Sequence, residues 1–211
     1  MYKRQQTAEQ LLKEVRFDAI RGNISEIKTL ASLCGTQEKN SGNMAVSDTM
    51  DVEKITDKSD HCGKITGIDG SGRGVDADNA DTVTEENLAQ HISNAKMLSK
   101  KLQTIVAITG AIDLVTDGSS CYVIRNGNPQ MGHVTGAGCQ LSGILTAFLA
   151  ANPENKLQAA AAAVCMMGYA GELAAEKSGQ SGSGTYRVSL MDAVSCMDGD
   201  ILERGARYEI R

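Results

Sequence analysis

Residues 135–139 (TGAGC) combine the features of an anion-binding turn. The two glycines allow positive φ angles and the close approach of a ligand. The apolar residues that follow recur at helical spacing and predict a helix starting at this turn: Leu141, Ile144, Leu145, Phe148 and Leu149. The first N–H groups of a helix lack internal partners and its dipole favours negative charge, so the turn is a candidate phosphate site.

Cys139 ends this turn, and its thiol has two interpretations. At a helix N-terminus the thiolate form is favoured, which makes Cys139 a candidate base or nucleophile. Alternatively, the turn is an ordinary Gly-rich loop before an apolar helix, and Cys139 is a small hydrophobic residue.

Two further polar segments follow short apolar runs. Residues 21–23 (RGN), with Glu26 after them, follow the apolar run 17–20, and Thr109-Gly110 ends the β-branched run 104–109. Ligands of α/β proteins bind beyond the carboxyl ends of parallel strands, so we expect these segments to share one edge of a sheet with residues 135–139. An arginine, an acid and an anion-binding turn suit phosphoryl transfer, which depends on positioning and charge neutralisation.

The elements around these segments alternate between helix and strand, which predicts an α/β fold with a mainly parallel sheet. We expect one domain over residues 1–211, with a polar insertion at about 35–60. The pattern predicts helices over 7–15, 24–34, 84–101, 156–177 and 186–197, a helix from the TGAGC turn to Pro153, and strands over 17–20, 104–109, 113–117 and 121–125. Asn126-Gly127 predicts a hairpin turn, and residues 201–211 read as a charged tail.

Composition excludes several classes of function. The net charge is −5, which argues against a nucleic-acid surface, and no apolar run reaches the roughly 20 residues that span a bilayer. Residues 1–10 are polar, unlike a secretory signal, and the six cysteines form no C-x-x-C pair. We therefore expect reduced thiols and a cytoplasmic protein without a membrane or nucleic-acid partner.

Three segments together resemble the hydroxyethylthiazole kinase family: residues 21–27 (RGNISEI), 107–117 (AITGAIDLVTD) and 134–139 (VTGAGC). This family phosphorylates the hydroxyl of 4-methyl-5-(2-hydroxyethyl)thiazole with ATP and magnesium (Mg2+) in thiamine biosynthesis and salvage. The resemblance implies a ribokinase-like, three-layer α/β/α fold with a mainly parallel central sheet. It also implies a homotrimer with active sites at the subunit interfaces.

The resemblance assigns the nucleotide and the metal to the first two segments. Arg21 and Thr109 match positions that contact ATP, and the planar fork of an arginine suits phosphate oxygens. Asn23 and Glu26 match an N-x-x-E motif whose acid orients magnesium through water. The same Asn–Glu pair also fits a helix capping box, and both roles are compatible.

The third segment corresponds to the transfer site. Gly136 matches a substrate contact, and Gly136, Ala137, Gly138 and Cys139 match the anion hole for the transferred γ-phosphoryl group. Cys139 occupies the position of the aspartate base of ribokinase relatives, where it acts as a base or shapes the site.

The family pattern begins with a longer N-terminal segment that carries strands of the sheet, so we expect this chain to lack those strands. This leaves two alternatives to the thiazole kinase. One is a catalytically impaired fragment or assembly subunit of the same family. The other is a related ribokinase-like kinase that acts on another small alcohol.

Overall fold

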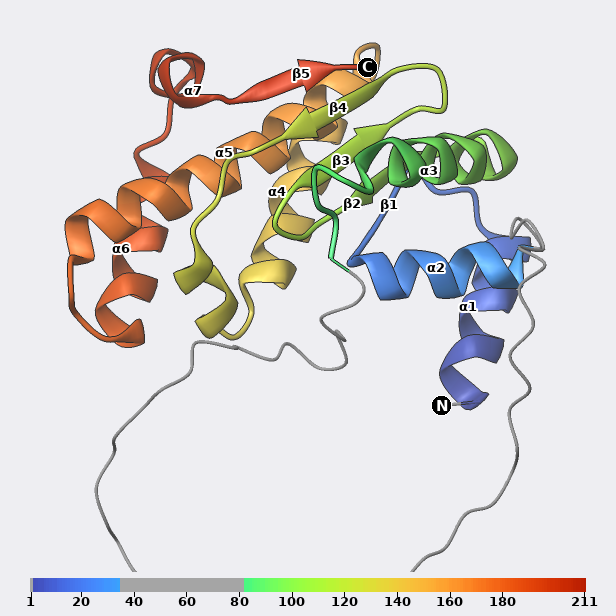
Figure 1. Ribbon diagram of the computed structural model, residues 1–211, viewed down its shortest axis with the longest axis horizontal. Coiled ribbons are helices and arrows are strands. Elements are labelled where there is room, and N and C mark those ends of the chain that lie inside the picture. The colour runs from blue at the N-terminus through green and yellow to red at the C-terminus, as the bar shows by residue number, and fades with distance from the viewer. Residues whose placement is uncertain (1, 35–81) are drawn as a thin grey trace, which may run out of the picture.

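A computed structural model of the protein describes residues 2–34 and 82–211, with side chains described from residue 6 (Figure 1). The polar insertion predicted at about 35–60 lies outside these residues. Within them, a sheet of strand order β1-β2-β3-β4-β5 has helices on both faces, which confirms the three-layer α/β/α prediction.

The sheet is mixed in the described part of the chain. β1 (Ala19–Gly22) pairs in parallel with β2 (Ile105–Ile108). β3 (Asp113–Thr116), β4 (Cys121–Ile124) and β5 (Tyr208–Ile210) then follow, each antiparallel to the strand before it. As a result, the carboxyl ends of β1, β2 and β4 and the start of β3 lie at the same edge of the sheet.

All the predicted helices are present, with ends that differ by a few residues. They are α1 (Tyr2–Glu14), α2 (Ile24–Leu33), α3 (Leu88–Leu102), α4 (Ala137–Ala151), α5 (Lys156–Ser178) and α6 (Ser183–Ser195). α3 begins after Asn87 rather than at Thr84, because the Asn87 side chain accepts a hydrogen bond from the Thr84 N–H and closes a turn there. A 3-10 helix, η2 (Pro129–His133), and a short helix, α7 (Gly199–Gly205), were not predicted.

Two apolar cores lie on opposite faces of the sheet. α2 and α3 pack over one face against Val106, Ile108 and Leu114, and α4 and α5 cover the other against Ala107 and Val115 (Figure 1). All four residues of β2 are buried, as expected for a strand covered on both sides. The alternation along each strand therefore decides which side chains face α4 and α5.

Helix α5 is the centre of the second core. Its alanines allow close packing against the sheet, α4 and α6; those fully buried are Ala160, Ala163, Ala170 and Ala174. By length and composition α5 could cross a membrane, but 67% of its apolar window is buried in the protein. It is therefore the core helix of the domain.

The hairpin predicted at Asn126-Gly127 is wrong. The β3–β4 hairpin turns instead at Asp117, whose carboxylate accepts hydrogen bonds from the Ser119 and Ser120 N–H groups. Asn126 is buried, and its side chain binds Gly205 O and the Arg207 N–H. The segment after β4 therefore crosses the end of the sheet rather than reversing direction.

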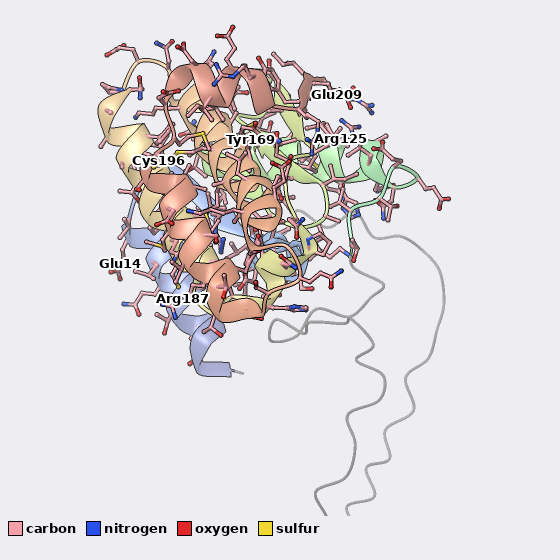
Figure 2. The ribbon with its side chains drawn as sticks, turned by 90° about the vertical axis from the view of Figure 1, so that its left-hand side faces the viewer. Glu14, Arg125, Tyr169, Arg187, Cys196 and Glu209 are labelled. Atoms are coloured by element: carbon pink, nitrogen blue, oxygen red, sulfur yellow. The ribbon has the colours of Figure 1, made fainter. Side chains whose placement is uncertain are left out.

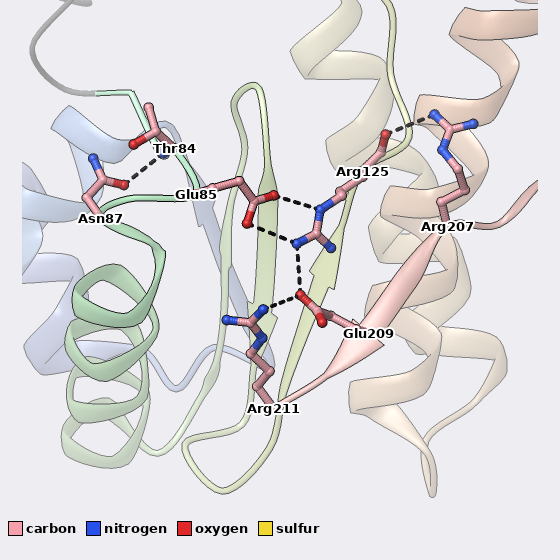
Figure 3. A network of polar contacts seen from close by, with 7 residues as sticks. All are labelled: Thr84, Glu85, Asn87, Arg125, Arg207, Glu209 and Arg211. Atoms are coloured by element: carbon pink, nitrogen blue, oxygen red, sulfur yellow. Dashed lines mark hydrogen bonds and ion pairs between the residues drawn. The ribbon is translucent and has the colours of Figure 1, made fainter.

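The charged tail predicted for residues 201–211 is also wrong, because these residues form α7 and the edge strand β5. The Cys121 and Arg211 N–H groups each donate to the carbonyl of the other residue. The charges pair along the sheet: Arg125 binds Glu85 at 2.9 Å and Glu209 at 2.8 Å, and Arg211 also binds Glu209 (Figures 2 and 3). A charged sequence can thus form an edge strand when its side chains find opposite charges.

Glu172 on α5 joins this strand to the segment after β4. Its carboxylate accepts hydrogen bonds from Asn126 Nδ2 at 3.1 Å, from the Gly127 N–H at 2.7 Å and from both terminal nitrogens of Arg207. The Glu172 side chain is only 17% exposed. α5 can approach this segment because residue 168 is glycine: a Cβ there would lie 2.6 Å from Asn126 O.

We predict that Glu172→Ala lowers the free energy of unfolding by about 2 kcal/mol, because it removes the acceptor shared by the buried Asn126 side chain, the Gly127 N–H and the Arg207 guanidinium. Urea denaturation monitored by circular dichroism measures the change. Glu176→Ala, an exposed glutamate one turn further along α5, is the matched control and should leave stability unchanged. Equal midpoints for the two variants would show that the Glu172 contacts contribute nothing.

Candidate active site

The described residues form a cavity of about 620 Å³ beyond the carboxyl ends of β1 and β2. Its walls come from the end of β1, the β2–β3 turn, the segment after β4, the start of α4 and the middle of α5. Its lining includes polar and small residues from each of these elements, among them Arg21, Thr109, Gly110, Asp113, Ala137 and Gly138. The predicted convergence of the three polar segments on one sheet edge is therefore present in the structure.

The guanidinium of Arg21 lies against the first turn of α4. A Cβ at Gly138 would be 3.2 Å from both terminal nitrogens of Arg21, so a side chain there would require the guanidinium to shift by a few tenths of an ångström. Nε of Arg21 is buried and has no hydrogen-bond partner within the described residues. The positive end of the α4 dipole also lies here, so two positive centres meet where an anion between them would be favourable.

The start of α4 leaves backbone donors available to a ligand. Gly136 is the N-cap, with φ of 94° and no side-chain capping bond. Ala137 and Gly138 line the cavity, whereas Gly136 and Cys139 are exposed beside it. The N–H groups of Gly138 and Cys139 belong to the first turn, where the helix itself supplies no acceptor.

The turn that carries Thr109 is fixed from two sides. The Thr109 N–H donates to Gly22 O at 2.9 Å, which ties the end of β2 to the end of β1. The Gly110 N–H donates to Oδ1 of Asp113 at 2.8 Å, which ties the turn to the start of β3. Thr109 is half-buried and faces the cavity, in the same wall as Arg21.

Asp113 is the residue that sequence reasoning missed. Burial raises its pKa from 3.8 to about 7, opposed by the hydrogen bond from Gly110 and the positive charge of Arg21. In the sequence, Asp113 looked like the first residue of an apolar strand. The available signal was a carboxylate at the start of an otherwise apolar strand. A buried carboxylate is rare unless it has a partner or a functional role.

Asn23 and Glu26 form the capping box of α2 and lie outside the cavity lining. The Glu26 N–H donates to Asn23 Oδ1, and the Asn23 N–H donates to Glu26 Oε2, both at 2.8 Å. Glu26 Oε2 also lies 3.0 Å from where a Cβ of Gly22 would be, so the carboxylate sits over the residue next to Arg21.

Glu26 is the exposed carboxylate in this region that could contact a metal ion. Among the described residues there is no group of three or more His, Cys, Asp or Glu side chains that could hold a metal ion. Glu26 keeps free lone pairs after accepting one backbone hydrogen bond. This arrangement fits Mg2+, which keeps several waters and is usually shared with phosphates.

The segment after β4 forms a wall of the cavity, which the predicted hairpin at Asn126-Gly127 did not anticipate. Asn126, Asn128, Pro129 and Met131 all line the cavity. Asn128 caps η2 by accepting a hydrogen bond from the Gln130 N–H, with Pro129 in the first turn. The Asn-Pro sequence was the signal for this helix start.

Comparison with known proteins agrees with the geometry. The model of the hydroxyethylthiazole kinase family matches residues 48–200 of this chain. Hydroxyethylthiazole kinase from Clostridium acetobutylicum is 42% identical over 98% of this chain and 63% of its own length. The enzyme from Desulfovibrio desulfuricans is 33% identical over the same shares of the two chains.

A solved structure supports the fold independently. The hydroxyethylthiazole kinase protein from Pyrococcus horikoshii OT3 gives a TM-score of 0.70 at 21% identity, covering 100% of this chain and 61% of the other. The chain thus spans about three fifths of the length of the relatives it matches. With the family model matching most of its residues, the chain belongs to the hydroxyethylthiazole kinase family.

Proposed function

We propose that the protein transfers the γ-phosphoryl group of ATP to the hydroxyl of 4-methyl-5-(2-hydroxyethyl)thiazole. The observation that carries this proposal is the Arg21 guanidinium against Gly138 at the start of α4, inside the cavity of about 620 Å³. The relatives named hydroxyethylthiazole kinase support the choice of alcohol. They favour it over the other small alcohols of ribokinase-like kinases.

The chain's own groups would position and neutralise the phosphates. Arg21 would pair with phosphate oxygens through the nitrogens that face the cavity, and Thr109 would contact the nucleotide from the turn beside it. The first-turn N–H groups of Gly138 and Cys139 would hold the oxygens of the group in transfer, with Ala137 closing the turn. Gly136 would contact the thiazole alcohol from the N-cap.

The transfer is a displacement at phosphorus. The alcohol oxygen forms a bond to the γ-phosphorus, and the bond from that phosphorus to the bridging oxygen breaks, leaving its electron pair on ADP. The alcohol proton needs an acceptor, and Cys139 is our candidate because it lies exposed in the first turn of α4. If a thiolate is not the acceptor, Cys139 shapes the site.

The metal site would be shared with the nucleotide. Glu26 would hold magnesium through water, with Asn23 fixing the carboxylate by the capping box. When bound, the metal neutralises phosphate charge. A homotrimer and a cytoplasmic location belong to the same proposal; apolar side chains such as Val188, which is 63% exposed on α6, offer surface for subunit contact.

We predict that Arg21→Ala raises KM for ATP by about 10- to 100-fold, because a charge-assisted contact to phosphate contributes about 1.5–3 kcal/mol. ADP release in a coupled assay with the thiazole alcohol measures it. Arg187→Ala is the matched control, since Arg187 is exposed on α6 (Figure 2) and is not among the residues that line the cavity. An unchanged KM for Arg21→Ala would remove Arg21 from the nucleotide site.

We predict that Cys139→Ala lowers kcat by about 100-fold or more with little change in KM for ATP, the effect expected for a lost general base. Steady-state kinetics at saturating ATP measures it, with Cys196→Ala, another exposed cysteine, as control. A change in KM for the alcohol at constant kcat would instead assign Cys139 to the shape of the site.

We predict that Glu26→Gln raises the magnesium concentration needed for half-maximal rate by about tenfold, because the water-mediated contact loses its charge. The glutamine oxygen can still accept from the Asn23 N–H, so the melting temperature should be nearly unchanged. A magnesium titration and a thermal melt separate the two roles. A variant that melts early but needs no extra magnesium would leave Glu26 with the capping role alone.

A further inference from the structure

Asp113 is the only acid among the described residues that line the cavity. It is 9% exposed, and the hydrogen bond from the Gly110 N–H reaches one of its two carboxylate oxygens. The positive charge of Arg21 acts on it, yet no ion pair within 4 Å joins these two side chains in the described part of the chain. The charge of Arg21 is therefore shared between Asp113 and whatever anion enters the cavity.

Within residues 2–34 and 82–211, few other titratable groups face Asp113. Strand alternation places it on the face of the sheet covered by α5, where the buried Cys165 thiol lies near it with a pKa raised to about 12 by burial and by the Asp113 charge. Arg125 follows β4 at the same edge, but its guanidinium is held by Glu85 and Glu209 (Figure 3). His91 and Lys96 belong to α3, which covers the opposite face.

A phosphate bound at the start of α4 would raise the proton affinity of the Asp113 carboxylate. It would take the positive charge of Arg21 for itself and place a second negative charge in the cavity that holds the carboxylate. Both effects disfavour an ionised carboxylate in a poorly solvated place. The Gly110 N–H can donate to the carboxyl group in either state, so the β2–β3 turn does not depend on the proton.

We propose that Asp113 takes up a proton when a phosphate-bearing ligand binds in this cavity, so that nucleotide affinity falls as the pH rises. The ligand class rests on the proposed function; the coupling rests on the buried carboxylate and the guanidinium that share one cavity. By reciprocity, a ligand that raises the proton affinity of Asp113 must itself bind more tightly to the protonated form. Asp113 is then a positioning residue that sets the charge of the site through Arg21.

The charges around Asp113 determine the direction in which ligand binding changes its pKa. Burial raises the pKa of Asp113 to about 7 in the free protein, while Arg21 lowers it. Neutralising Arg21 with phosphate removes the lowering influence, so the bound form has the higher pKa. Between the two values, affinity for the anion falls by up to about tenfold for each unit of pH.

Isothermal titration calorimetry with ATP and magnesium chloride, in two buffers of different ionisation enthalpy, counts the protons taken up at the pH where Asp113 titrates, about 7. Because ATP also titrates near neutral pH, the reading is the difference between the wild-type chain and Asp113→Asn. At that pH the Asp113 carboxyl of the free protein is about half-protonated, so we expect up to about half a proton more for the wild type, approaching one proton about one pH unit higher, and a Kd that rises more steeply with pH. Asp117→Asn, an exposed aspartate at the other end of β3, is the control and should behave as wild type.

The outcomes separate this inference from the kinase proposal. Equal proton uptake by the wild type and Asp113→Asn overturns the coupling, while measured phosphorylation of the thiazole alcohol would keep the kinase. Extra uptake by the wild type without phosphorylation supports the coupling and contradicts the kinase. Absence of ATP binding overturns both. Should Asp113→Asn fail to fold, the carbon-13 shift of the Asp113 carboxyl in the wild type, with and without ATP, gives the change in pKa directly; no rise overturns the proposal.

Discussion

The contact between Arg21 and the start of α4 brings two positive centres together in a partly buried place. Such a contact is unfavourable by itself, because the guanidinium and the helix dipole repel one another and Nε of Arg21 lacks a protein partner. The glycine at position 138 leaves room for the guanidinium beside the helix. Packing of β1, α4 and α5 therefore holds together two positive centres that an anion between them would stabilise.

The cavity wall formed by the segment after β4 depends on contacts with residues just before β5. Glu172 on α5 fixes Asn126 and Gly127, and Arg207 at the start of β5 completes the arrangement. Arg125 is held by Glu85 and Glu209, so its charge is already paired (Figure 3). Of the two arginines in the described lining, Arg21 is therefore the one without an ion pair among the described residues, and Asp113 is the acid that lines the same cavity.

Much of the fold was predictable because local patterns carried it. The apolar spacing after residue 136 defined α4, the alanines defined α5, and the β-branched run defined β2. The failures share one cause: Asn126-Gly127 and residues 201–211 have turn-like or charged sequences whose structure is set by distant partners. Asn126 is buried only because Gly205 and Glu172 reach it, and β5 forms only because β4 offers an edge.

By itself, the sequence determined the three polar segments, their residue types and the α/β order that brings them to one sheet edge. It did so because turn chemistry and hydrophobic period are local properties of the chain. Only the tertiary structure decided that Arg21 lies on Gly138, that Cys139 and Glu26 lie beside the cavity lining rather than in it, and that Asp113 is the buried acid within it. Burial and charge proximity join residues far apart in the chain, and no local pattern records them.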